Sequence, residues 1–435
     1  MSKTFKNIPQ ESLYNRIQPG FTMTTLDNGL KIMIEEVPTV ESFALGIWVK
    51  TGTRDEPNEL AGLAHFIEHM TFRRTATRSS RQIASQFESV GAYTNAFTTK
   101  EHTCFYVRAL KQHFKKTLRL LADVMLHPAF HPADFEKEKL IILEEIKSYE
   151  DEPEELIIDF SDRQLFGNHP LGNPILGTAE TVLKTEIRDI QKFYSEEYHP
   201  ANMIVSVVGN VKREQVEREI EALFKNIPTK SVAIERHAPN LLKATRQEVV
   251  KPVQQAHYMA ARIIPGVGSP DRYAFAVLNT LLGDGMSSRL YQRVRERWGL
   301  AYTVYSSLQL MTDIGVMSIY AGMDDKNVLK TEKIITEELL KLSEKPVSKP
   351  ELQRAKEQLK SSIIMSLESM SERMQMMAKG ELEEGGYEDA SATIAAIDTV
   401  SADDLLRLMR EYGDFGDWST VVILPEEVEG KRGKF

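Results

Sequence analysis

The chain has 435 residues, and its 42% hydrophobic and 27% charged residues predict a globular protein of two or more domains. Its net charge of −9 disfavours nucleic acid as a partner, and its apolar runs are too short to cross a membrane. The N-terminal segment lacks the apolar core of a secretory signal, and the lone cysteine, Cys104, cannot form an intrachain disulfide, so we expect a cytoplasmic protein in which Cys104 is buried in a strand.

The first half of the chain alternates short strands with amphipathic helices. Alternating apolar residues predict strands, and apolar residues repeated every three or four positions predict helices. In chain order, we expect strands at 30–34 and 43–49, helices at 60–72 and 80–90, strands around Ala96 and at 104–109, helices at 112–126 and 132–149, and a strand at 203–208.

The second half repeats this order of elements without strong sequence identity. We expect a strand at 256–264, a helix at 272–282, strands at 302–307 and 315–321, helices at 326–342 and 349–370, and a strand at 420–424. The repeat indicates an α+β fold with two domains related by duplication. Prolines and a lack of apolar periodicity mark a linker, so we place the N-terminal domain at 1–228, the linker at 229–247 and the C-terminal domain at 248–435.

One short motif on the predicted helix at 60–72 has the spacing of metal ligands. His65, Glu68 and His69 form the sequence His-x-x-Glu-His. On a helix, His65 and His69 lie one turn apart, so both imidazoles share a face and can reach one metal ion. Glu68 shares that face and can hold a water beside the metal. At most about three chains in 100 of this composition would contain the motif by chance, and other residues must decide between a metal site and two ordinary histidines.

A catalytic zinc site usually has three protein ligands, so a third donor is needed. The predicted helix at 132–149 carries Glu138 and Glu145, which are seven residues apart and therefore share a face. The apolar residues at 140–143 predict that this helix is buried, and a buried carboxylate is costly unless it binds something. Glu144 is the competing third ligand.

These residues resemble the signature of the M16 metallopeptidases, also called inverzincins or the pitrilysin family. In that family, a Glu-Ile pair stands about 75 residues beyond the His-x-x-Glu-His motif. Another Glu precedes this pair by seven residues. Ile146 therefore favours Glu145 over Glu144 as the third ligand. The resemblance implies one Zn²⁺ per chain, with these roles: His65, His69 and Glu145 as metal ligands, Glu68 as the general base, and Glu138 as a second acidic residue that orients the catalytic site.

Residues 91–98 read Gly-Ala-Tyr-Thr-Asn-Ala-Phe-Thr and resemble the family strand that lies next to the metal. The resemblance implies that Asn95, Ala96 and Phe97 bind the substrate. Main-chain hydrogen bonds from an edge strand can hold an extended peptide with little demand on its sequence.

Two segments of the second half also resemble the family. Gly283 and Gly285 precede Ser-Ser-Arg-Leu and resemble its glycine-rich loop, which implies a part in substrate binding; the loop lacks the Lys of a phosphate loop. Arg295 and Tyr302 resemble an Arg–Tyr element that reaches the substrate near the zinc. Arg offers a fixed cationic fork, and a Tyr hydroxyl can donate to an oxyanion, so both are assigned to catalysis.

The resemblance covers residues 20 to 425, and the chain length matches the short branch of bacterial processing peptidases and mitochondrial processing peptidase subunits. It implies two α/β sandwich domains with mostly antiparallel sheets, which face each other as a clamshell. The implied function is endopeptidase cleavage of unfolded peptides in an enclosed chamber, by a bacterial-type homodimer, because this chain carries both half-sites. The alternatives are a non-catalytic assembly subunit and a partner-dependent subunit of a heterodimer.

Overall fold

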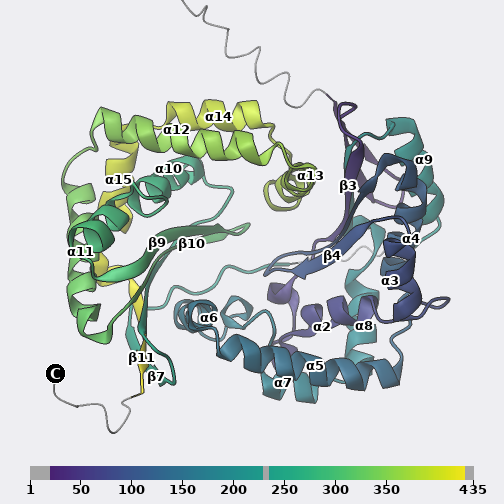
Figure 1. The fold of residues 1–435 in the computed structure, drawn as a ribbon, viewed down its shortest axis with the longest axis horizontal. Helices are drawn as coiled ribbons and strands as arrows, with labels where there is room; N and C mark the ends of the chain where they lie inside the picture. Colours follow the sequence, from purple (N-terminus) through teal and green to yellow (C-terminus); the bar gives the residue numbers. More distant parts are fainter. Residues whose placement is uncertain (1–19, 229–234, 427–435) are drawn as a thin grey trace, which may run out of the picture. The chain divides into compact units, whose positions relative to one another are not determined.

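The chain forms two compact units in the computed structural model, which describes residues 20–228 and 235–426 (Figure 1). The first unit consists of the described residues up to Glu144, Pro174–Arg236 and Ser362–Ala395. The second unit consists of Glu145–Asn173, His237–Ser361 and the described residues from Ala396 onward. Each unit therefore takes segments from both halves of the sequence.

The first unit is built on a six-stranded sheet with the order β1-β2-β6-β3-β5-β4. β2 and β6 are parallel, and the other neighbouring pairs are antiparallel. β4 is the last strand in this order and pairs with β5 alone. The strands are β1 (Phe21–Thr25), β2 (Lys31–Glu36), β3 (Ser42–Val49), β4 (Tyr93–Thr98), β5 (Thr103–Leu110) and β6 (Met203–Gly209).

Both faces of this sheet are covered, because side chains of β3 alternate between two helical layers. On one face, Phe43 makes an edge contact with Phe114 of α4, with ring centroids 5.2 Å apart. On the other face, Trp48 lies in one apolar cluster with Met374 and Met377 of α13. The helices whose residues belong mainly to this unit are α2 (Leu63–Thr71), α3 (Ser80–Glu88), α4 (Phe114–Leu126), α5 (Pro132–Glu150), α7 (Ala179–Lys184), α8 (Ile187–Glu197), α9 (Arg213–Phe224), α13 (Met370–Lys379) and α14 (Ala390–Thr399).

The second unit is built on a five-stranded sheet with the order β7-β11-β8-β10-β9. β11 and β7 are parallel and the other neighbouring pairs are antiparallel. The strands are β7 (Arg246–Lys251), β8 (Ala256–Pro265), β9 (Ala301–Leu310), β10 (Ile314–Met323) and β11 (Ser419–Pro425). The helices are α6 (Pro153–Phe166), α10 (Arg272–Leu282), α11 (Val328–Glu344), α12 (Lys349–Ser366) and α15 (Ala402–Tyr412).

Short turns connect these elements. The 3-10 turns are η1 (Thr53–Asp55), η2 (Asn58–Leu60), η3 (Lys111–His113), η4 (Pro170–Gly172), η5 (Pro200–Asn202), η7 (Asp325–Asn327) and η9 (Phe415–Asp417). Two π-helical turns are η6 (Tyr291–Arg297) and η8 (Gly380–Glu384).

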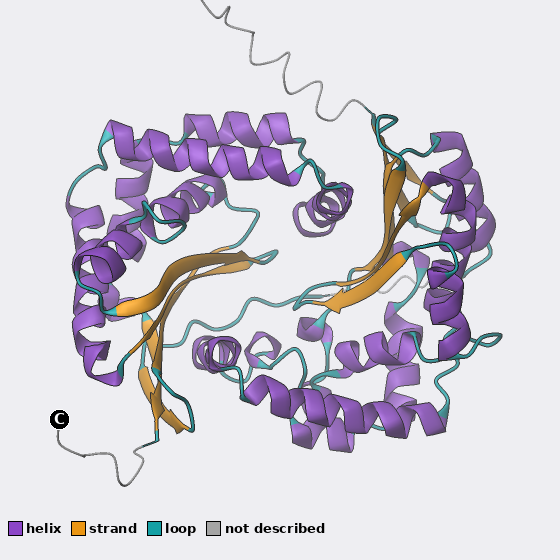
Figure 2. Cartoon of the chain, viewed as in Figure 1, coloured by secondary structure: helices purple, strands orange, loops and turns teal. Residues whose placement is uncertain are grey.

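The two sheets share one topology. We number the strands β2 to β6 of the first sheet, and β7 to β11 of the second, from first to fifth in chain order. In both sheets the strands then lie in the order first, fifth, second, fourth and third, and the first and fifth are parallel. Helices pack on the strands of both sheets, as Figure 2 shows. The predicted fold of two α/β units related by duplication is therefore confirmed, whereas the clamshell arrangement stays a prediction.

The compact units do not follow the predicted domain boundaries. α6, from the first half, packs on β8 and β11 of the second sheet, and α13, from the second half, packs on β3 and β6 of the first. The predicted helix at 349–370 is interrupted, because α12 ends at Ser366 and Ser369 caps a new helix, α13. In the predicted linker, residues 229–234 lie outside the described part of the chain, and the linker's end overlaps β7.

Candidate metal centre

The helix α2 carries the His-x-x-Glu-His motif and is held at its first turn by Glu56. The backbone N–H groups of Gly62 and Ala64 donate to the two Glu56 carboxylate oxygens at 2.7 and 2.6 Å. Burial raises the pKa of Glu56 to about 8, against the opposing effect of these two donors. Unpaired N–H groups at a helix start are costly when buried, so Glu56 helps to fix where α2 begins.

A close backbone crossing also fixes the start of α2. Gly62 adopts φ +95°, and a Cβ atom there would lie 2.6 Å from the Leu176 carbonyl oxygen. A Cβ atom at Gly177 would lie 2.1 Å from the carbonyl oxygen of Ala61. These two positions therefore require glycine, because any side chain would separate the two segments.

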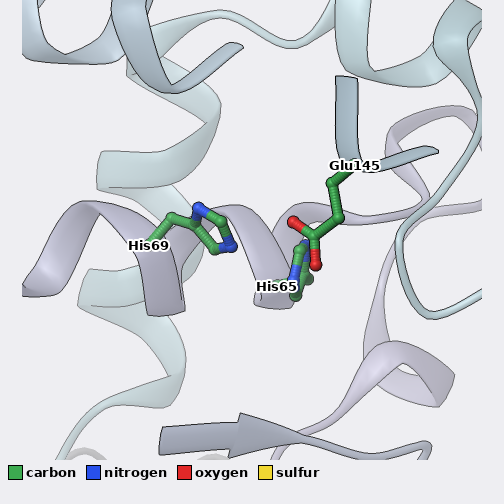
Figure 3. Close-up of side chains that lie close together, drawn as sticks. All are labelled: His65, His69 and Glu145. Atoms are coloured by element: carbon green, nitrogen blue, oxygen red, sulfur yellow. The ribbon is translucent and has the colours of Figure 1, made fainter. Parts of the chain in front are cut away.

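The structure brings His65, His69 and Glu145 together, from α2 and α5 (Figure 3). One donor atom from each lies within 4.8 Å of the other two, and the imidazole centroids are 4.6 Å apart. His65 is buried, while His69 and Glu145 are half-buried. Glu144 is exposed and lies outside this cluster, so the geometry favours Glu145 as the third donor.

Glu138 lies beneath His69 and is almost fully buried, with 1% exposure. Its Oε2 is 3.1 Å from His69 Nδ1, and its Oε1 forms an ion pair with Arg73 Nε. Metal-binding histidines typically hold their second ring nitrogen against a carboxylate, which fixes the ring and its tautomer. The position of Glu138 leaves Nε2 as the His69 atom that can bind a metal.

Glu68 lies on α2 between the two histidines and contacts the end of β4. Thr98 Oγ1 donates to Glu68 Oε2 at 2.6 Å. α2 packs against β4, and Thr98 is the last residue of that strand. This contact orients the Glu68 carboxylate and joins the motif helix to the edge strand of the sheet.

The predicted substrate residues of β4 differ in their environments. The Ala96 N–H donates to Asn95 Oδ1 at 2.9 Å, so this backbone donor already has a hydrogen bond to a side chain of β4 itself. Phe97 packs edge-on against Trp48, with centroids 5.6 Å apart, and is therefore tied to the core. β4 has its other side free of a paired strand in the described sheet, and its substrate-binding role stays a prediction.

Arg295 and Tyr302 belong to the second unit and contact each other there. The Arg295 guanidinium carbon lies 4.8 Å from the centroid of the Tyr302 ring. Tyr302 is 78% exposed at the start of β9. Their approach to the histidines of the first unit stays a prediction.

The glycine-rich loop has a structural reason for both of its predicted glycines. A Cβ atom at Gly283 would lie 2.2 Å from the backbone nitrogen of Ser306, so the loop packs tightly against β9. Gly285 has φ +87°, and a Cβ atom there would lie 2.5 Å from Gln358 Nε2. Both positions are explained by packing and backbone conformation, and a part in substrate binding stays a prediction.

Sequence reasoning missed four residues that hold this machinery. Their signals were weak: an acidic residue shortly before the motif helix, an Arg one turn beyond the second histidine, a Thr after Asn-Ala-Phe, and an aromatic residue one turn before an Arg. They are Glu56, Arg73, Thr98 and Tyr291. Arg73 and Thr98 contact segments that are distant in sequence, Glu56 contacts the helix start a few residues further on, and Tyr291 lies in an irregular turn.

The comparisons with known proteins extend over almost the whole chain. The uncharacterized zinc protease YmxG of Bacillus subtilis is 37% identical over 389 residues, which cover 89% of this chain and 94% of that protein. An uncharacterized zinc protease of Mycobacterium leprae is 35% identical over 425 residues, covering 94% of each chain. The crystal structure of a protease from Helicobacter pylori has a TM-score of 0.87 at 24% identity, covering 93% of this chain and 99% of that chain.

The fold and the cluster of His65, His69 and Glu145 define the class of protein. It is an α/β protein with a duplicated sheet and a candidate metal centre on the first copy. The family model described as insulinase (peptidase family M16) matches residues 31–179, and the model described as peptidase M16 inactive domain matches 186–359. This chain belongs to peptidase family M16. Among the described residues, no helix has both the length and the apolar character needed to span a bilayer.

Proposed function

We propose that this chain is a zinc-dependent endopeptidase that hydrolyses unfolded peptides or oligopeptides. The observation that carries the proposal is the cluster of His65, His69 and Glu145, with the Glu68 carboxylate on the same helix as the two histidines. Two relatives that are at least 35% identical are named zinc proteases, which supports the same metal and the same reaction class here.

The donor set fits zinc. Two imidazole nitrogens and one carboxylate oxygen are a common ligand set of catalytic zinc, and they leave a coordination position open. The partial burial of the three groups and the Glu138 contact to His69 are what such a site requires around its ligands. We therefore assign one Zn²⁺ per chain to this cluster.

The chemistry that zinc supplies when bound is Lewis acidity, which lowers the pKa of water and favours negative charge on a peptide carbonyl oxygen. Glu68 takes a proton from the attacking water and passes it to the leaving amine. Thr98 Oγ1 holds one Glu68 oxygen, so the carboxylate keeps its orientation during both transfers. Glu138 acts on His69 and does not contact the substrate.

Two further parts of the chain bind the substrate in this proposal. The open edge of β4 pairs with an extended peptide, and Asn95 must release the Ala96 N–H for that pairing. Tyr302 donates its hydroxyl to the developing oxyanion, and Arg295 contacts a substrate carbonyl or carboxylate. Because an added strand must be extended, unfolded peptides are the expected substrates.

Substituting Glu68 by Gln tests the proposal. The variant keeps the size of the side chain but cannot take a proton, so hydrolysis of a quenched fluorescent peptide library should fall at least about 100-fold. Its zinc content, measured by mass spectrometry of the metal, should stay at one per chain. Glu144→Gln, an exposed neighbour on α5, is the control and should keep full activity. Wild-type hydrolysis by zinc-loaded Glu68→Gln would contradict the assignment.

The oligomeric state and a subunit role are tested with the same preparations. We propose a homodimer with two competent sites, because one chain carries both the zinc motif and the Arg295–Tyr302 pair. Native mass spectrometry should show a dimer with chelator-sensitive activity in the absence of any other protein. A zinc-free chain without peptidase activity would instead support a non-catalytic subunit, and activity that appears only with a second polypeptide would support a heterodimer.

A further inference from the structure

The turn that carries Arg295 has an unusual backbone. Residues Tyr291–Arg297 form a π-helical turn, a rare geometry that occurs frequently at functional sites. The chain leaves this turn through Gly299, at φ +57°, whose N–H donates to the Arg295 carbonyl at 2.9 Å. The Leu300 N–H donates to the Val294 carbonyl at 3.0 Å. These hydrogen bonds close the turn and hold the residues just before β9 next to Val294 and Arg295.

Two tyrosine rings contact the Arg295 guanidinium as a result. Its central carbon lies 4.9 Å from the centroid of Tyr291 and 4.8 Å from that of Tyr302. Both distances are within the range of cation–π attraction. Tyr302 is largely exposed, whereas Tyr291 is half-buried beside the fully buried Val294, so Tyr291 is the better anchored of the two rings.

The chemistry of the guanidinium explains what this contact can do. Its N–H donors lie in the plane of the group and point outward from its edge, whereas aromatic rings attract the cation through their faces. A ring that holds the guanidinium leaves its N–H groups available to a substrate carbonyl or carboxylate. A free Arg side chain would instead sample many rotamers and would lose this rotamer entropy when it binds the substrate.

We infer that Tyr291 is a positioning residue for substrate binding, which holds the Arg295 guanidinium ready to contact the peptide substrate and acts on the reaction through Arg295. This inference rests on the role given to Arg295 in the proposed function. Tyr291 need not contact the substrate, and its hydroxyl has no part in the contact, because the ring face supplies the attraction.

A double-mutant cycle on the full-length zinc-loaded protein tests the inference with a peptide substrate. A cation–π contact of about 0.5–2 kcal/mol corresponds to roughly 2- to 30-fold, so Tyr291→Leu should lower kcat/KM by that factor. The loss should fall in the same parameter, KM or kcat, that Arg295→Gln changes. Tyr291→Phe should stay within about 2-fold of wild type, because it keeps the ring. In the Arg295→Gln background, Tyr291→Leu should cause no further loss.

A matched control lies in the same segment. Trp298 is 46% exposed and contacts a different cation, with Lys330 Nζ 4.2 Å from its ring centroid, so Trp298→Leu should leave kcat/KM unchanged. Thermal unfolding of each variant establishes that it is folded.

Three outcomes would overturn the inference. Equal losses for Tyr291→Phe and Tyr291→Leu would show that the ring is not responsible, and an undiminished loss in the Arg295→Gln background would show a structural role. Wild-type kinetics of Arg295→Gln would show that Arg295 has no part in the reaction, so Tyr291 could not act through it. Failure of the proposed peptidase function is distinguishable, because it would appear as wild-type activity of Glu68→Gln or as no zinc-dependent activity in any variant.

Discussion

The side chains of α5 determine which glutamates can serve a metal. Its buried residues recur at intervals of three or four positions and form one stripe, which consists of Phe135, Glu138, Ile142 and Ile146. Glu145 borders this stripe and is half-buried, whereas Glu144 is exposed. A buried carboxylate needs a partner to offset its desolvation, and Glu138 has two of them in His69 and Arg73.

One part of the sequence interpretation of α5 was wrong. The apolar residues at 140–143 were expected to bury the helix, but Leu140 is 65% exposed and Ile141 is 43% exposed. A continuous apolar run points in several directions around a helix, so it does not identify the buried face. The spacing of Glu138 and Glu145 follows the helical period, so one of them lies on the buried stripe and the other borders it.

Removing the Glu138 carboxylate should weaken zinc binding without destroying it. Glu138→Gln loses the charge beside His69 Nδ1, and loss of such a partner typically costs about 10- to 100-fold in metal affinity. Competition with a chromophoric chelator measures the zinc dissociation constant. Glu136→Gln, on the exposed side of α5, should bind zinc as wild type does. An unchanged dissociation constant in Glu138→Gln would show that the contact does not orient the ligand.

At the scale of elements, Glu56 links the placement of α2 to stability. In Glu56→Ala, the buried N–H groups of Gly62 and Ala64 lose their acceptor, so the free energy of unfolding should fall by about 1–3 kcal/mol. Urea unfolding followed by circular dichroism measures the change. Glu59→Ala, an exposed substitution three residues further along the same loop, should change the unfolding free energy by less than about 0.5 kcal/mol. Equal stability of the two variants would exclude Glu56 as an anchor of α2.

Several long elements were predicted from sequence because their apolar periodicity is strong, but the helices α6, α8, α9, α14 and α15 were not predicted. α10 agrees with its predicted bounds, and β3, β6 and β11 agree to within a residue at each end. β1 and β7 were missed, because both are short edge strands in which no residue is buried. Edge strands are stabilised by pairing with a neighbour more than by their own apolar pattern, so a single sequence gives little sign of them.

The candidate site was predictable only where its geometry is local. The positions of His65 and His69 follow from one turn of helix, and the sharing of a face by Glu138 and Glu145 follows from two turns. The contact between Thr98 and Glu68 depends on how β4 docks against α2, which no local pattern encodes. The same holds for the ion pair of Arg73 with Glu138.

At the scale of the whole molecule, the two copies of the fold differ at the helix that carries the metal motif in the first copy. In each copy a helix follows the second shared strand, and these helices are α2 and α10. α10 has the sequence Arg-Tyr-Ala-Phe-Ala-Val-Leu-Asn-Thr-Leu-Leu and contains no histidine or glutamate. Among the described residues, the histidine–glutamate cluster of the first copy is therefore without a counterpart on this helix of the second.

The exchange of segments between the halves also has a physical basis. Met374 and Met377 of α13 are fully buried in the core of the first unit, and the Arg373 guanidinium forms a buried ion pair with Glu35 of β2. A Cβ atom at Gly46 of β3 would lie 2.5 Å from Met374 Sδ, so the helix approaches the sheet closely. Both methionines belong to the apolar cluster around Trp48.

The assignment of one zinc to one place in the chain is tested most directly by anomalous diffraction from crystals of the zinc-loaded protein, measured on both sides of the zinc absorption edge. We expect one anomalous peak per chain, about 2.0–2.2 Å from one nitrogen each of His65 and His69 and from a carboxylate oxygen of Glu145. A peak at other residues, or none at this cluster in a protein with chelator-sensitive peptidase activity, would contradict it.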